Sequence, residues 1–501
     1  MASQTTLLEL IQAAPSGHTA VILPEPGIRV TYGSLCDQVL ALAEALAAAG
    51  IQPGDRVATV MPSGLPAIVS FLAASIAGTA APLNPGYRYD EFCYYIEDTN
   101  ARVMLCPPDG ATEARRAAEG KIPVFTLEMD AAGVVRMLDA PAVTGRPPRA
   151  PAAEDIALIL HTSGSTGHPK RVPILHSNLA ISARNIVRTY ALTPDDVSLC
   201  VMPLFHVHGL TASTLATFLS GGTVVTPAKF NPLSFWRTVR DVHATWYSAV
   251  PTIHQLLVAR AGKERPPGAE GLRFIRSCSA ALPPDMMGKL ESAFGAPVLE
   301  AYGMTEAAHQ MCSNPLPPGE RKPGSVGPGT GVGISIMDAK GTHLETGERG
   351  EVVIQGPNVV KGYENNPEAN AASFTNGWFR TGDQGFVDAG GYLTLTGRIK
   401  ELINRGGEKI APREIDEVLL THPAVAEAVA FGFAHPTWGE EVAAAVVLRE
   451  PAGESEILAH CRARLADFKC PKKLFVVDAI PRTATGKIQR NSMAATLQCG
   501  T

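Results

Sequence analysis

The hydrophobic pattern changes character once along the chain. Up to about residue 400, apolar runs of strand length alternate with alanine- and leucine-rich stretches of helical period. The strand-like runs are 56–61, 102–106, 156–160, 221–227 and 272–277, and the helix-like stretches include 65–78 and 211–219. Because strands that alternate with helices favour parallel pairing, this part of the chain predicts an α/β fold of layered sheets and helices.

Beyond residue 400 the segments become shorter. Strand-like runs at 424–433, 442–448 and 473–477 are interspersed with one helix-like stretch at 456–468. This texture predicts a small α+β domain of about 100 residues. A proline- and alanine-rich stretch at 140–153 predicts a surface linker.

Composition narrows the class of protein. With 501 residues the chain is too long for one ordinary core, so we expect at least two domains. Hydrophobic residues make up 45%, charged residues 18%, and the formal charge is −5, which is typical of a globular protein and gives no reason to expect nucleic acid as a partner. The nine cysteines include no CxxC pair and are odd in number, so we expect neither a disulfide framework nor a zinc site. The protein is therefore expected in a reducing compartment.

The ends of the chain carry no obvious targeting signal. The N-terminal residues lack a basic region before their short apolar stretch, and no segment reaches about 18 uninterrupted apolar residues. We therefore expect neither secretion nor a membrane span. The last residues, LQCGT, differ from the Ser-Lys-Leu peroxisomal signal, so the cytoplasm is the expected location.

The first segment with chemical character is HTSGSTGHPK, at 161–170, directly after the strand-like run 156–160. Glycines and small hydroxyl residues let a backbone approach phosphate oxygens, and Lys170 adds a positive charge. The segment is not a Walker loop, because Pro169 precedes the lysine and Arg171 follows it. Taken alone, it fits a phosphate cradle or a flexible turn equally well. Its candidate phosphate-binding residues are Thr162, Ser163, Gly164, Ser165, Thr166, Gly167 and Lys170.

Further segments follow in a fixed order. They are PLFHVHG at 203–209, EAYGMTE at 300–306, WFRTGD at 378–383, GRIKELINRGG at 397–407 and PRTATGKIQR at 481–490. With this ordered set the chain resembles the acyl-adenylate-forming superfamily of acyl-CoA synthetases, luciferases and peptide-synthetase adenylation domains. The resemblance implies an ATP- and Mg²⁺-dependent enzyme that joins a carboxylic acid to coenzyme A through an acyl-adenylate.

The resemblance also implies a domain plan. Residues 1–397 would form the large domain that holds ATP and the acid, residues 398–400 a hinge, and residues 401–501 a mobile α+β domain. Lys400 stands at the position of the family's hinge residue. Rotation about this hinge would alternate two faces of the small domain between the two half-reactions, bringing Gly406 and Gly407 to the pantetheine arm of coenzyme A. A glycine pair also fits a tight turn, and the two interpretations are compatible.

The chemistry explains why these residue types are needed. Attack of a carboxylate on the α-phosphate of ATP brings two anions together, so the site must neutralise charge. Glu306 resembles the family's magnesium-binding glutamate, with the Thr305 hydroxyl close by. Lys487 matches the lysine that bridges carboxylate and α-phosphate, although a lone lysine is more often simply solvated. The catalytic set that the resemblance implies is Lys487, Thr305, Glu306 and His206.

The nucleotide contacts are implied in the same way. Tyr302 would stack on adenine, Asp383 would accept hydrogen bonds from both ribose hydroxyls, and Arg398 would contact the same sugar. In isolation, Tyr302 also fits core packing and Asp383 a surface turn. The remaining residues implied to bind ATP are Ser279, Ala280, Ala281, Glu300, Ala301 and Gly303, with Thr305 and Lys487. Lys487 would further be a target for a lysine acetyltransferase and deacetylase, because acetylation removes the charge that adenylation needs.

The acid is expected to be small and anionic. The segments that would surround it carry polar groups, and over 244–257, 272–280, 304–327 and 397–412 the text closely resembles oxalate–CoA ligases. The second carboxylate of oxalate needs donors, which His206, Ser279 and His309 could supply. Each histidine also fits a packing role, and for His208 a packing role and a role in binding the acid fit equally well. Malonate is disfavoured, because Ala301 stands where malonate-specific relatives place an arginine.

Three alternatives stay open at this point. A medium-chain or aromatic acid could replace oxalate, since the sequence does not reveal pocket depth. An adenylating enzyme could load a carrier-protein thiol in place of free coenzyme A. A non-catalytic nucleotide sensor would be expected to lose Lys487 or Glu306, and both are present.

Overall fold

The computed structural model describes residues 5–138, 140–141, 149–162, 169–262, 264–483 and 488–498. The chain forms two compact units. The first comprises Met1–Pro323, Gly327–Gly333 and Gln355–Phe374, and the second comprises Gly324–Val326, Ile334–Ile354 and Thr375–Thr501. The second unit therefore takes in more chain than the expected small domain. The boundary at 397 and the hinge at 398–400 stay predictions, because a division into compact units does not show which residues move.

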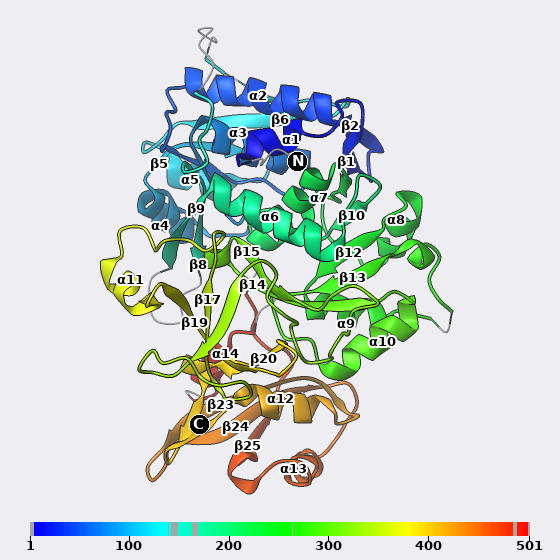
Figure 1. Ribbon diagram of the computed structural model, residues 1–501, viewed down its shortest axis with the longest axis vertical. Coiled ribbons are helices and arrows are strands. Elements are labelled where there is room, and N and C mark those ends of the chain that lie inside the picture. Colours follow the sequence, from blue (N-terminus) through cyan, green and yellow to red (C-terminus); the bar gives the residue numbers. More distant parts are fainter. Residues whose placement is uncertain are drawn as a thin grey trace. The chain divides into compact units, whose positions relative to one another are not determined.

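The first unit is built on two largely parallel sheets (Figure 1). In both sheets the described strands pair in parallel except at β1–β2, β14–β15, β6–β7 and β8–β9. In spatial order, the eight-stranded sheet contains β15 (His309–Ser313), β14 (Val298–Met304), β13 (Phe274–Ser277), β12 (Trp246–Ala249), β10 (Val197–Cys200), β11 (Thr223–Val225), β1 (Thr19–Leu23) and β2 (Ile28–Thr31). The seven-stranded sheet contains β7 (Val135–Leu138), β6 (Val124–Met129), β5 (Ala101–Cys106), β3 (Arg56–Thr59), β4 (Thr79–Pro82), β8 (Ile156–Thr162) and β9 (Lys170–Leu175).

Helices connect the strands of the first unit, as the alternating pattern predicts. They are α1 (Leu7–Gln12), α2 (Tyr32–Ala48), α3 (Leu65–Ala77), α4 (Tyr89–Thr99), α5 (Thr112–Ala118), α6 (His176–Tyr190), η1 (His208–Leu215), α7 (Ala216–Ser220), α8 (Phe235–Asp241), α9 (Pro251–Ala259), η2 (Ala269–Gly271), α10 (Pro284–Phe294), η3 (Thr305–Ala307) and α11 (Pro367–Ser373). The predicted α/β fold class is confirmed. One local prediction needs correction: most of the expected helix 211–219 is a π-helix, η1, and only its end is α-helical in α7.

The second unit contains two smaller sheets (Figure 1). One has β16 (Gly333–Met337), β17 (Gly350–Gln355), β19 (Trp378–Val387), β18 (Phe374–Thr375) and β20 (Leu393–Arg398), and the other has β22 (Glu408–Ile410), β21 (Ile403–Arg405), β24 (Gly439–Leu448), β23 (Val425–His435) and β25 (Lys473–Val476). The helices are η4 (Ile399–Glu401), α12 (Pro412–Leu420), α13 (Glu454–Arg462), η5 (Asp467–Lys469) and α14 (Arg490–Gln498). The expected helix 456–468 ends early, at Arg462.

The long strand β23 shows why its sequence is almost continuously apolar. Side chains on a strand alternate between the two faces of the sheet. Ala428 and Ala430 lie in a core with α12 and α13, whereas Val429 and Phe431 lie in a second core with α14. Both faces are covered, so both sets of positions are apolar. No helix among the described residues is long and apolar enough to cross a membrane.

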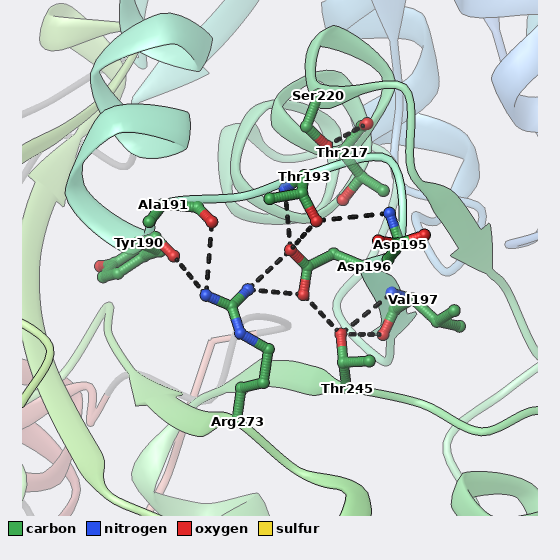
Figure 2. Close-up of polar contacts among 10 residues, drawn as sticks. All are labelled: Tyr190, Ala191, Thr193, Asp195, Asp196, Val197, Thr217, Ser220, Thr245 and Arg273. Carbon is green, nitrogen blue, oxygen red and sulfur yellow. Dashed lines mark hydrogen bonds and ion pairs between the residues drawn. The ribbon is translucent and has the colours of Figure 1, made fainter.

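An ion pair between an exposed arginine and a buried carboxylate fastens the end of α6 to the eight-stranded sheet (Figure 2). Arg273 donates to both carboxylate oxygens of Asp196 at 2.6 Å, and to the backbone carbonyl of Tyr190 at 3.1 Å. Asp196 also accepts from the Thr193 backbone at 2.8 Å and from the Thr245 hydroxyl at 2.7 Å. This pair holds the last residue of α6, Tyr190, beside β13.

Candidate active site

The candidate site lies where three parallel strands end. Strands β12, β13 and β14 are neighbours in the sheet, and parallel strands present their carboxyl ends at one edge. Ser279 follows β13, and Thr305 and Glu306 follow β14. Residues implied to bind the acid, the nucleotide and the metal therefore come from adjacent strand ends. More than 100 sequence positions separate them from residues 161–170, the predicted phosphate-binding stretch, which we call the phosphate segment.

A buried arginine joins these strand ends to the histidines. Arg276 lies on β13, directly opposite Ser248 of β12, and its side chain is fully buried. Its Nε donates to the Tyr190 hydroxyl at 2.8 Å, and Nη1 donates to Ser248 at 2.9 Å. Its Nη2 lies 3.0 Å from His309 Nε2 and 3.1 Å from the Gln310 side-chain oxygen. We call this group the Arg276 cluster: Tyr190, His208, Ser248, Arg276, Ser279, His309 and Gln310.

Two histidines of the cluster stack on each other. The rings of His208 and His309 lie 5.2 Å apart at an interplanar angle of 23°. His208 Nδ1 lies 2.9 Å from the Ser279 hydroxyl, and its Nε2 lies 2.6 Å from the Ser248 hydroxyl. The structure thus brings two predicted acid-binding residues, Ser279 and His309, together with His208, whose role the sequence left open. The third predicted residue, His206, is half-buried, with its ring 4.8 Å from that of Phe205.

Strained backbone marks the same place. Ser279, Ala308 and His309 have φ angles of 72°, 51° and 121°, which non-glycine residues rarely adopt. Such conformations persist where the surrounding structure enforces them, and they are concentrated at functional sites. Ser279 is half-buried and the next two residues, Ala280 and Ala281, are exposed, so the buried cluster meets the surface at Ser279.

Local sequence explains the position of His208. It is the first residue of the π-helix η1, a rare helix type often found at functional sites. A Cβ atom on Gly209 would lie 2.3 Å from the backbone oxygen of Pro203 and 2.7 Å from that of Met202. Only glycine permits this close approach, so Gly209 lets the chain turn back on itself directly after His208.

Glu306, the predicted Mg²⁺ ligand, is a buried carboxylate with one hydrogen-bond donor beside it. It lies in η3, is 5% exposed, and accepts a hydrogen bond of 2.8 Å from the Tyr363 hydroxyl. The Lys170 ammonium group lies 4.5 Å from the centre of the Tyr363 ring, which links the phosphate segment to Glu306. Magnesium in nucleotide enzymes is held by one or two carboxylates together with substrate phosphates. Glu306 fits that requirement, and the described residues contain no cluster of three or more metal-binding side chains.

A charged cluster anchors both ends of the phosphate segment. His161 Nε2 lies 2.8 Å from Asp98, and Arg171 Nε lies 3.5 Å from the same carboxylate. Glu364 pairs with Arg171 at 3.5 Å and also with Arg56. Burial lowers the pKa of His161. Arg171 departs from the glycine usual in the family, and the structure gives it this anchoring role, which the sequence alone did not suggest.

The other predicted phosphate and nucleotide residues are distributed as follows. Thr162 ends β8 and Lys170 begins β9, whereas Ser163, Gly164, Ser165, Thr166 and Gly167 lie outside the described residues. Glu300, Ala301, Tyr302 and Gly303 lie on β14, and Tyr302 is buried.

In the second unit, Asp383 and Arg398 face each other. They are register partners on β19 and β20, and Arg398 Nε lies 2.9 Å from the Asp383 carboxylate. Lys400 lies in η4 and is exposed. Gly406 and Gly407, both with positive φ, form the two-residue turn between β21 and β22, as a hairpin of this length requires. Their contact with coenzyme A stays a prediction. Lys487 lies outside the described residues.

Sequence reasoning did not find the cluster arginine. Its one signal is a charged residue inside the apolar run LRFIRS, which breaks the apolar pattern of a buried strand. An arginine at such a position needs several acceptors, and these come from α6, β12, β15 and η1, which only the fold brings together.

Comparison with known proteins assigns the family. Residues 9–364 match the model of the AMP-binding enzyme family, and residues 414–487 match that of the AMP-binding enzyme C-terminal domain. The chain is 48% identical to an oxalate–CoA ligase from Arabidopsis thaliana over 477 residues, covering 93% of each chain. It is 44% identical to an oxalate–CoA ligase from Saccharomyces cerevisiae, covering 96% of this chain and 95% of the relative.

A solved structure supports the same assignment. The ATP-bound MatB from Rhodopseudomonas palustris superposes with a TM-score of 0.90 at 32% identity, covering 99% of both chains. The predicted enzyme class is thereby confirmed. The chain belongs to the AMP-binding enzyme family, and it is an ATP-dependent, AMP-forming acyl-CoA synthetase that uses a carboxylic acid, ATP, Mg²⁺ and coenzyme A.

Proposed function

We propose that the acid is oxalate, and that the reaction converts oxalate, ATP and coenzyme A into oxalyl-CoA, AMP and diphosphate. The observation that carries this proposal is the Arg276 cluster, in which a buried guanidinium, two imidazoles and a hydroxyl meet at the strand ends. A medium-chain or aromatic acid would call for an apolar surface at this place. The similarity to two oxalate–CoA ligases supports the same acid.

The roles of the residues follow from the charges. ATP supplies the α-phosphate that one carboxylate of oxalate attacks, which gives an acyl-adenylate and diphosphate. Glu306 would hold Mg²⁺, with Tyr363 fixing the carboxylate, and Lys170 would neutralise phosphate charge. Lys487 would bridge the attacking carboxylate and the α-phosphate. The coenzyme A thiol then displaces AMP from the adenylate.

The second carboxylate of oxalate would be held by His206, Ser279 and His309. It is ionised near neutral pH, so it accepts hydrogen bonds and needs donors on the protein. The half-buried Ser279 hydroxyl lies at the boundary between the cluster and the surface. Asp383 would accept from both ribose hydroxyls, with Arg398 beside it.

The deciding experiment is a comparison of thioester formation among acids. The wild-type enzyme, with ATP, Mg²⁺ and coenzyme A, is tested on oxalate, malonate, acetate, octanoate and coumarate, and kcat/KM is compared. We expect the highest value for oxalate and its loss in His309→Ala. Activity on octanoate or coumarate with none on oxalate would discard the proposed substrate and leave the enzyme class intact.

The same assay separates the remaining alternative. An enzyme that loads a carrier-protein thiol would release diphosphate with oxalate but form no thioester with free coenzyme A. Diphosphate release together with oxalyl-CoA formation supports the synthetase. Replacing Lys487 by alanine is expected to reduce diphosphate release far more than it reduces conversion of preformed adenylate to thioester.

A further inference from the structure

Arg276 differs in its partners from three arginines that form ion pairs. Arg380 and Arg490, whose side chains are largely buried, pair with Glu351 and Asp416, and the exposed Arg273, three residues before Arg276, pairs with Asp196 (Figure 2). Arg276 is 0% exposed, yet within the part of the chain that the structure describes no carboxylate forms an ion pair with it. The groups that accept its hydrogen bonds are two hydroxyls, an imidazole and an amide oxygen, none of them a carboxylate.

A buried positive charge without a counter-ion is costly, unless something supplies the negative charge. Hydrogen bonds to neutral groups satisfy the N–H donors of Arg276 and leave its net charge uncompensated. The potential of this charge extends through a medium of low polarity, where it attracts an anion more strongly than it would in water. The nearest part of the cluster that meets the surface is Ser279.

The guanidinium also orients the hydrogens around it. Because arginine only donates, His309 Nε2 must accept, and the neutral ring carries its proton on Nδ1. Ser248 accepts from Arg276 Nη1, so its own hydroxyl hydrogen is available for His208 Nε2 at 2.6 Å. His208 then carries its proton on Nδ1 and donates it to the Ser279 oxygen at 2.9 Å.

This chain of donors ends at the hydroxyl of Ser279, which is half-buried. With its oxygen accepting from His208, Ser279 has its own hydroxyl hydrogen left to donate. A donor at this point favours an anionic acceptor over a neutral one. The fixed charge on Arg276 thus attracts a negative group and also orients the Ser279 hydroxyl so that it can donate to that group.

We infer that Arg276 is a specificity-determining positioning residue, which makes the acid site select an acid that carries a second negative charge besides the carboxylate that reacts. It acts through His208, Ser279 and His309. This inference deepens the proposed function and rests on it for the location of the acid. Its chemistry, however, concerns any small acid with two negative charges, oxalate being the one that we propose.

The test compares oxalate with oxamate, which has nearly the same size but carries a neutral amide in place of the second carboxylate. The dissociation constants of both are measured by calorimetry with the wild-type enzyme, Mg²⁺ and the α,β-methylene analogue of ATP. In Arg276→Met the preference for oxalate over oxamate is expected to fall at least about 30-fold. Arg276→Lys keeps the charge and is expected to retain most of the preference.

A second variant keeps the acceptor oxygen that faces Arg276 and cancels the charge, although it loses the Gln310 amide donations to the Thr189 and Thr330 hydroxyls. Gln310 accepts from Arg276 at 3.1 Å, so Gln310→Glu places a carboxylate beside the guanidinium in nearly the same shape. It is expected to lower the preference for oxalate as Arg276→Met does. Because it forms an ion pair where none existed, it tests the inference even if Arg276→Met does not fold. Arg273→Met, the same change three residues away, is the control and is expected to lower stability without changing the preference.

The outcomes separate the two proposals. A wild-type enzyme that prefers oxalate, with Arg276→Met or Gln310→Glu folded and its preference unchanged, would overturn the inference and leave the proposed function standing. If another doubly charged acid such as malonate is preferred and both variants abolish that preference, oxalate is wrong and the role of Arg276 stands. A wild-type enzyme that prefers octanoate or coumarate overturns both.

Discussion

The ion pair that holds the last helix of the second unit offers a sharp test of the energetics. Arg490 begins α14, three residues after Lys487, and only 12% of its side chain is exposed. Its Nη2 lies 2.8 Å from Asp416 of α12, its Nε lies 3.1 Å from Glu401, and it donates to the backbone carbonyl of Ala430 in β23. This single side chain therefore ties the start of α14 to a helix and a strand.

The expected cost of losing it follows from what remains. In Arg490→Met the Asp416 carboxylate, with 11% of its side chain exposed, loses its positive partner. Removing one member of a buried pair costs about 3–5 kcal/mol, because the other charge is left uncompensated. That is a large part of the about 5–15 kcal/mol by which a domain is stable. If Lys487 bridges the acid and ATP, its displacement would reduce kcat for diphosphate release about 100-fold.

A double-mutant cycle isolates the pair. Asp416→Asn keeps an oxygen for the Ala430 backbone N–H and removes the charge, so the double variant Asp416→Asn with Arg490→Met leaves no uncompensated charge at position 416. Glu401, whose side chain is 29% exposed, loses its partner in both Arg490→Met variants and therefore does not affect the difference between them. We expect it to recover at least about 2 kcal/mol of the free energy of unfolding lost in Arg490→Met. Urea unfolding, read by hydrogen exchange in peptides from α12 and β23, measures both values. A loss below about 1 kcal/mol in Arg490→Met, with no recovery in the double variant, would refute the reasoning.

Three further predictions concern the first unit. Burial lowers the pKa of His176 from 6.5 to about 4. The neutral ring therefore contributes fully to the free energy of unfolding above pH 6.5, and about 3 kcal/mol of this contribution is lost as the pH falls towards 4. Urea midpoints should be lower at pH 5 than at pH 8, and His176→Gln should remove this difference. Tyr363→Phe removes the hydrogen bond to Glu306 and should raise the Mg²⁺ concentration needed for half-maximal activity about tenfold, and an unchanged Mg²⁺ titration would contradict this role. Gly209→Ala forces a Cβ against the Pro203 carbonyl and should cost about 1–3 kcal/mol of stability, measured by thermal unfolding; equal stability would show that the turn relaxes freely.

Short-range patterns in the sequence predicted many of the strands. The strand-like runs at 56–61, 102–106 and 424–433 lie at β3, β5 and β23, because a short apolar run between helical stretches has few other ways to bury both faces. The stretch expected to be helical at 211–219 is helical, but only its second part is an α-helix. Its first part belongs to a π-helix, which includes Gly209, where a Cβ atom would lie 2.3 Å from the Pro203 carbonyl oxygen.

The sequence by itself determined the α/β class, the order of the chemical segments and the residues that the family's reaction needs, since these depend on local pattern and on motifs that are contiguous in the chain. Only the tertiary structure decided that His208 joins Ser279 and His309, and that Arg276 lies buried behind all three. These residues lie on β13, β15 and η1, so their meeting depends on strand register and crossover. The uncompensated charge of Arg276 is a property of everything packed around it, and no single segment of the sequence contains that information.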